Sequence, residues 1–188
     1  MASHPTHDKL IDAALRLAAE RPLATIPVED IVREAGVAKG TFYVHFADRG
    51  AFLAAVTRRV NHGLMRATVD VVGTMPPGAE RLAAGAVAYL DASLAQVAAK
   101  STLLESRFEP AVAIEAARCK GDSATVMQGD VEALGIPDPT TTARLLAALV
   151  AETALIELER GGADPSARAA LLALLPHTEI TARTPDLV

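Results

Sequence analysis

The sequence predicts an all-α fold, and two observations support this prediction. Of the 188 residues, 51% are hydrophobic but only 3% are aromatic, and tryptophan is absent. Such a chain, dominated by alanine and leucine, favours closely packed helices over a β-sheet. Apolar residues also recur three and four positions apart along much of the chain, which is the spacing of one helical face.

The N-terminal residues predict three helices, with a tight turn between the second and the third. The first helix covers residues 9–20, and its apolar face consists of Leu10, Ile11, Ala14, Leu17 and Ala18. Pro22 breaks this helix, and Pro27 suits the first turn of a second helix that runs to about Ala35. Gly36 then ends the second helix, because glycine adopts the left-handed conformation without a Cβ clash.

A third short helix is expected over residues 38–46, directly after this turn. Phe42 and Phe46 are four residues apart, so both lie on one face and are expected in the core. Two short helices joined by a glycine turn form a helix-turn-helix motif. Asp48 is a suitable N-cap for a fourth, long helix that runs to about Val72.

This long helix is expected to connect two domains. We place a helix-turn-helix domain at residues 1–48 and a larger helical domain at residues 49–188. Pro76-Pro77-Gly78 ends the long helix, and Asp-Pro pairs at 138–139 and 164–165 each place a capping carboxylate before a first-turn proline. The further helices are expected at residues 79–99, 102–108, 110–134, 139–160 and 165–175, with a loosely held tail at 177–188.

Charge and cysteine usage limit the possible partners. The formal net charge is −5, with +1 in the first 60 residues and −6 in the remainder. DNA binding would therefore depend on a few well-placed cations. No apolar run approaches the ~20 residues needed to span a bilayer, so we expect a cytoplasmic protein without membrane contact. The single cysteine, Cys119, has no disulfide or metal-ligand partner, and neither a metal nor a cofactor is expected.

The segment IVREAGVAKGTFYVHF, residues 31–46, resembles the DNA-binding signature of the tetracycline-repressor (TetR) family. The matching residues are Asp30, Ile31, Ala35, Gly36, Val37, Gly40, Thr41, Phe42, Tyr43, His45, Phe46 and Arg49. The resemblance covers about residues 10–56. It implies a ligand-responsive transcriptional regulator that binds operator DNA through its helix-turn-helix. It further implies a homodimer and a repressor that a small, mainly apolar effector releases from a palindromic operator.

The outer face of the third helix is narrow enough to enter the major groove. The residues expected to contact DNA are Lys39, Gly40, Thr41, Tyr43, Val44, His45 and Arg49. Lys39 is the candidate donor to guanine O6 or N7, and Gly40 allows the helix to approach the DNA closely. The similarity to the family implies that Arg49 contacts a phosphate. It also implies that Thr41, Tyr43 and His45 contact phosphate oxygens and thymine methyls. Each residue alone would be an ordinary surface or packing residue, and the joint pattern indicates DNA binding.

The resemblance also implies an effector pocket within residues 79–134 and a dimer interface within residues 139–175. The candidate pocket residues are polar, aromatic or sulfur-containing side chains on apolar segments: Tyr89, Arg107, Phe108, Glu115, Cys119, Met127 and Glu152. The candidate interface residues form apolar faces with small members: Ala143, Leu146, Ala147, Val150, Ala154, Leu155 and Leu158. These same residues are alternatively core within one chain.

Two other classes of function were weighed. An enzyme is not expected, because the sequence contains no H-E-x-x-H zinc motif, no phosphate-binding glycine loop and no nucleophile elbow. The second class is a helical adaptor or binding protein that uses the helix-turn-helix only as a structural corner. Retention on DNA at low salt distinguishes a regulator from an adaptor.

Overall fold

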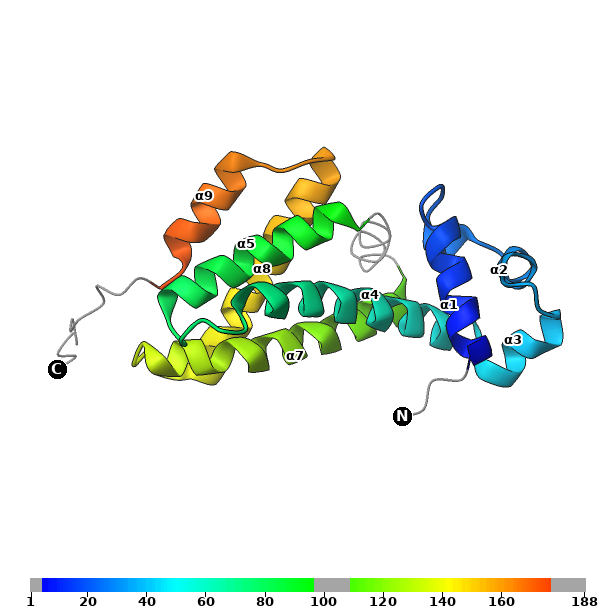
Figure 1. Ribbon diagram of the computed structural model, residues 1–188, viewed down its shortest axis with the longest axis horizontal. Helices are drawn as coiled ribbons and strands as arrows, with labels where there is room; N and C mark the ends of the chain where they lie inside the picture. Colours follow the sequence, from blue (N-terminus) through cyan, green and yellow to red (C-terminus); the bar gives the residue numbers. More distant parts are fainter. Residues whose placement is uncertain (1–4, 97–108, 177–188) are drawn as a thin grey trace.

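The computed structural model describes residues 5–96 and 109–176, and within these residues the chain is all-α, as predicted. The elements are α1 (Pro5–Leu17), the short 3-10 helix η1 (Leu23–Thr25), α2 (Val28–Ala35), α3 (Lys39–His45), α4 (Arg49–Val72), α5 (Ala79–Ala95), α7 (Pro110–Ala133), α8 (Pro139–Arg160) and α9 (Pro165–Leu174). Figure 1 shows α1, α2 and α3 as a head at one end of an elongated molecule, with α4 running from this head into a helical bundle. The expected helix at 102–108 and the tail at 177–188 lie outside the described residues.

The head forms around aromatic side chains at the expected positions. The ring of Phe52 lies 5.0 Å from that of Phe42 and 4.9 Å from that of Phe46, centroid to centroid, and all three side chains are buried. Gly36 ends α2 with a φ of 67°, the left-handed conformation that its sequence position predicted. These contacts fix α3 against the start of α4 with its opposite face outward.

The first helix is displaced from its expected position. It begins at Pro5 and ends at Leu17, whereas the periodicity predicted residues 9–20. A proline in the first turn lacks only an N–H that would have no helical partner there, so the helix extends further towards the N-terminus than its apolar pattern. The end of the helix is followed by turns that lead to η1.

The bundle contacts the head through α7 as well as through α4. α4 begins at the predicted cap, where Asp48 accepts a hydrogen bond from the backbone N–H of Ala51 at 2.7 Å. Val112, near the start of α7, is completely buried in the same apolar cluster as Phe52 and Val56 of α4. The core of the head therefore includes a side chain from a helix of the bundle.

α8 and α9 begin at the two predicted Asp-Pro caps. Asp138 accepts a hydrogen bond from the N–H of Thr141, and Asp164 accepts from the N–H groups of Ser166 and Ala167. The seven apolar α8 residues considered for a dimer interface are all buried within the single chain: Ala143, Leu146, Ala147, Val150, Ala154, Leu155 and Leu158. They are thus core residues of the single chain, and five of them, at positions 143, 146, 147, 150 and 154, share an apolar cluster with residues of α5 and α7.

Candidate functional site

The outer face of α3 exposes the residues that the sequence predicted to contact DNA. Lys39, Gly40, Tyr43 and Val44 are exposed, and Val44 retains 80% of its accessible surface. Thr41 and His45 are half-buried at the edges of the face. No described atom lies near the position that a side chain on Gly40 would take, so another molecule can approach the helix backbone closely there.

Lys39 is held by an acidic residue of the preceding helix. Its Nζ donates a hydrogen bond to Oε1 of Glu29 in α2. This bond and the attraction between the charges raise the pKa of Lys39 and lower the pKa of Glu29. Both side chains are more than half exposed, so water or a phosphate can replace this exposed ion pair at little cost.

Arg49 is bonded to the backbone that precedes α2. Its guanidinium donates to the carbonyl oxygens of Ile26 at 2.6 Å, Ala24 at 2.5 Å and Leu23 at 3.3 Å. These bonds fix the first turn of α4 against the entry to α2. The expected phosphate contact of Arg49 stays a prediction, and the structure adds a positioning role for the same side chain.

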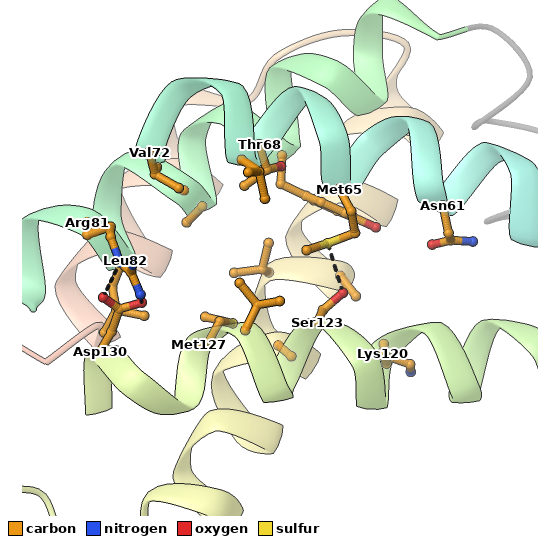
Figure 2. Close-up of a pocket in the computed structure, with 18 of the residues that line it drawn as sticks. Asn61, Met65, Thr68, Val72, Arg81, Leu82, Lys120, Ser123, Met127 and Asp130 are labelled. Carbon is orange, nitrogen blue, oxygen red and sulfur yellow. Dashed lines mark hydrogen bonds and ion pairs between the residues drawn. The ribbon is translucent and has the colours of Figure 1, made fainter. Parts of the chain in front are cut away.

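A cavity of about 280 Å³ lies in the bundle between α4, α5, α7 and α8. Its walls are mainly apolar, with Met65 and Val72 from α4, Leu82 from α5, Met127 from α7 and Val150 from α8. Figure 2 shows the side chains of α4 and α7 facing one another across this space. Concave, mainly apolar sites with a few polar groups are typical of small-molecule binding sites.

Charged residues lie at the two ends of the cavity (Figure 2). At one end the carboxylate of Asp130 accepts hydrogen bonds from Arg81 Nε at 2.6 Å and from the N–H of Gly78 at 3.0 Å, and its second oxygen accepts from Arg81 at 3.1 Å. Asp130 is buried, so this bidentate pair neutralises its charge inside the bundle. Lys120 and Asn61 lie towards the opposite end, where Lys120 is exposed.

Two of the seven predicted pocket residues line this cavity, namely Tyr89 and Met127. Burial raises the pKa of the Tyr89 phenol to about 12, so the hydroxyl stays neutral at physiological pH. Glu152 is an exposed residue of α8 and is absent from the described lining. Arg107 and Phe108 lie outside the described residues.

Glu115 and Cys119 lie elsewhere on α7, between the cavity and the head. Glu115 is buried and accepts hydrogen bonds from Arg58 of α4 at 2.9 and 3.0 Å and from Arg118 at 2.7 and 2.9 Å. The bond from Arg58 is the main reason that the pKa of Glu115 falls to about 2. Burial raises the pKa of the Cys119 thiol to about 11. Contact of either residue with an effector stays a prediction.

The polar lining of the cavity was missed by reasoning from the sequence. Asn61, Thr68, Ser123 and the Arg81–Asp130 pair all belong to it. A signal exists on α4, where polar and apolar residues at 61, 65, 68 and 72 recur at helical spacing. This stripe was read only as part of a connecting helix. Among the described residues, no helix is both long and apolar enough to cross a membrane.

A model of the family described as bacterial regulatory proteins, tetR family, matches residues 10–56. The uncharacterized HTH-type transcriptional regulator YvdT of Bacillus subtilis (strain 168) is 33% identical over 54 residues. These residues make up 29% of this chain and 28% of YvdT, so the chain spans less than a third of the length of this relative. The segment matched by the family model runs from within α1 through α2 and α3 into the first part of α4.

Two solved structures share the fold of nearly the whole chain. The multidrug binding protein EbrR, crystallised with imidazole, has a TM-score of 0.74 at 24% sequence identity, covering 98% of this chain and 100% of EbrR. RolR, crystallised with the ligand resorcinol, has a TM-score of 0.70 at 23% identity, covering 90% of this chain and 87% of RolR. At these identities the similarity shows a common fold.

Proposed function

Because the chain belongs to the TetR family of transcriptional regulators, we propose that it is a repressor which a small, mainly apolar effector releases from a palindromic operator. The observation that carries this proposal is the cavity, because α4 forms one of its walls and also leads into the head. A molecule bound in the cavity touches the helix that positions α3.

The DNA-binding part of the proposal rests on α3. We assign a base contact to Lys39, and Gly40 allows α3 to approach the DNA closely. Thr41, Tyr43 and His45 contact phosphate oxygens and thymine methyls in this proposal. The exposed Val44 suits contact with a thymine methyl, since an apolar side chain gains by leaving water. Arg49 adds positive charge at the edge of this face. Phosphate contacts set the register of the protein on DNA, and base contacts specify the sequence.

We propose that the regulator acts as a homodimer. α8 and α9 expose Leu145, Leu149 and Leu174, of which Leu145 and Leu174 retain 62% and 64% of their accessible surface. Leu145 and Leu149 are one helical turn apart and so share a face. A two-fold axis at this surface would present two reading helices to half-sites separated by about 34 Å or a multiple of it.

In this proposal, two helices transmit the effect of the bound effector to the head. α4 leads directly into the head, and α7 contacts the core of the head through Val112. The bond between Glu115 and Arg58 joins α7 to α4 between the cavity and the head. An effector that separates α4 from α7 would move the start of both helices. Only a difference in affinity between the two conformations can change operator binding.

The small ligands of the two structural relatives support a small effector. RolR was crystallised with resorcinol and EbrR with imidazole, both of which are single-ring compounds. The cavity of about 280 Å³ has room for a molecule of this class. An engineered cavity of about 150 Å³ is large enough to bind benzene.

The test begins with selection of DNA fragments from the source genome by the full-length protein. The selected operator should contain an inverted repeat, and one dimer of the protein should protect it. Lys39→Ala should relax the preference for this operator. Leu145→Glu combined with Leu174→Glu should give a monomer with weakened binding. A protein that selects no sequence at low salt would be an adaptor, which is the competing function.

A further inference from the structure

We infer that the cavity selects an uncharged, mainly apolar molecule that carries a hydroxyl group able to donate a hydrogen bond. This inference rests on the proposed effector role of the cavity and adds the chemistry of the effector. It follows from the direction in which the polar side chains of the cavity wall already donate their own hydrogens.

The two aliphatic hydroxyl groups of the wall, those of Thr68 and Ser123, donate their protons to carbonyl oxygens of their own helices. Thr68 donates to the carbonyl oxygen of Leu64 at 3.0 Å, and Ser123 donates to the carbonyl oxygen of Cys119 at 3.1 Å. Ser123 Oγ also lies 3.2 Å from the sulfur of Met65 (Figure 2). A hydroxyl has one proton and two lone pairs, so both groups are left as hydrogen-bond acceptors.

The other uncharged polar residues of the cavity wall also offer mainly hydrogen-bond acceptors. Asn61 uses one amide N–H to donate to the carbonyl oxygen of Thr57 at 3.0 Å, which leaves one N–H and the two lone pairs of its side-chain oxygen. Ser93 donates to the backbone carbonyl oxygen of Tyr89 at 2.8 Å, and the Tyr89 phenol, which burial keeps neutral, adds one hydrogen and two oxygen lone pairs to the wall. Backbone N–H groups within the helices are used in the helical ladder. The uncharged residues of the wall therefore offer more oxygen lone pairs than free hydrogens.

The charged residues of the cavity wall do not favour an anionic ligand. The positive charge of Arg81 is offset by the bidentate carboxylate of Asp130, which would repel a bound anion. Lys120 lies at the opposite end and is exposed, so water screens its charge. An anion that entered the apolar middle of the cavity would give up its hydration without receiving enough hydrogen bonds in return.

A hydroxyl compound matches both the polar and the apolar lining. Its hydroxyl donates to Thr68 or Ser123, while its hydrocarbon part contacts Met65, Leu82 and Val150. An apolar compound without a donor would leave these oxygens desolvated and unpaired, which lowers its affinity. The cavity is larger than the roughly 150 Å³ that accepts benzene, so a ring with a short alkyl chain is a suitable probe.

The test uses isothermal titration calorimetry on the full-length protein with three matched probes. They are para-butylphenol, para-butylfluorobenzene, which has nearly the same shape but no donor, and para-butylbenzoate, which is an anion. We expect the phenol to bind about tenfold or more tightly than either analogue, because the site discriminates by the missing hydrogen bond.

Two variants test whether the hydroxyl groups of the cavity wall cause the preference for the phenol. Thr68→Val and Ser123→Ala should each reduce the affinity for the phenol several-fold and leave the affinity for the fluorobenzene equal or higher. Thr125→Val is the matched control, because Thr125 is an exposed residue of α7 that also donates to the carbonyl four residues before it, at 3.1 Å. It should change neither affinity.

Three results would overturn the inference. Equal binding of phenol and fluorobenzene would show a purely apolar site and would leave the effector role of the cavity intact. Tighter binding of the benzoate, lost in Lys120→Met, would assign an anionic effector instead. No binding of any probe by protein that still selects its operator would overturn both this inference and the proposed role of the cavity.

Discussion

Glu115 of α7 accepts hydrogen bonds from both Nε and a terminal nitrogen of Arg58 in α4, at 2.9 and 3.0 Å. This pair joins two of the four helices that line the cavity, at a point between the cavity and the head. Arg118, one turn further along α7, bonds to the same carboxylate at 2.7 Å. Glu115 is thus the buried acceptor through which the position of α7 is tied to that of α4.

This arrangement predicts a pH-dependent contribution to stability. The pKa of Glu115 falls from 4.5 to about 2, so its charged form is favoured by folding. The contribution is complete above the unfolded pKa and is lost as the pH falls from about 4.5 towards about 2. Glu115→Gln should therefore be less stable than wild type by about 1–2 kcal/mol at neutral pH, and the difference should narrow below about pH 4.5.

Urea denaturation at a series of pH values measures this difference. Glu132→Gln is the control, because it makes the same chemical change at an exposed position of α7. A gap between wild type and Glu115→Gln that stays constant down to about pH 3 would mean that the Arg58 contact adds no stability through charge.

A second prediction concerns Lys39 and its partner Glu29. Lys39→Ala should lose about 1–3 kcal/mol on the operator and relax the preference at one base pair, if Lys39 reads a guanine. Glu29→Gln should act in the opposite direction, because it frees Lys39 and removes a negative charge near the DNA. Fluorescence anisotropy with operator and scrambled DNA separates the two effects. A uniform loss on all sequences in Lys39→Ala would assign Lys39 to the phosphate backbone.

Arg49→Ala should weaken binding to all DNA sequences similarly and reduce the slope of log affinity against log salt by about 1. The hydrogen bonds from Arg49 to the carbonyls of Leu23, Ala24 and Ile26 add a second effect, a lower melting temperature. Binding is therefore measured below the melting transition of the variant. An unchanged salt slope in folded protein would limit Arg49 to its positioning role.

Filling the cavity should abolish the response to effector while preserving DNA binding. Gly85 of α5 lines the cavity, and a Cβ placed on it would meet Thr68 and Val72 at 3.7 Å, an ordinary contact distance. Gly85→Leu should remove binding of para-butylphenol and retain operator affinity. Gly121→Leu is the control, because Gly121 is an exposed helical glycine with open space around it. Undiminished probe binding by Gly85→Leu would place the effector elsewhere.

The head and the ends of several other helices could be predicted from the sequence because their signals are local. Gly36 and the caps at Asp48, Asp138 and Asp164 act on the backbone within a few residues, so their effect does not depend on the rest of the fold. The aromatic pattern of Phe42 and Phe46 likewise placed one face of α3 inward.

The cavity and the packing partners of α8 could not be predicted in the same way. Thr68 and Ser123 lie far apart in the sequence, and only the packing of α4 against α7 brings them to one cavity. The apolar face of α8 was evident from periodicity, but periodicity cannot tell an intrachain partner from a second chain. Leu146 and Val150 therefore fit both interpretations from the sequence, and the structure packs them into one cluster with residues of α5 and α7.

The last prediction links the cavity to the head. An effector that lowers operator affinity tenfold must favour the non-binding conformation by about 1.4 kcal/mol, and operator DNA must then weaken effector binding by the same factor. Calorimetry with and without operator should show this reciprocity in wild type. Because Glu115 and Arg58 join α7 to α4 between the two sites, Glu115→Gln should still bind effector and operator but with a coupling factor closer to one. Equal effector affinity in free and operator-bound wild-type protein, despite release of DNA, would exclude this mechanism. Release would then have to come from competition at α3 or from dissociation of the dimer.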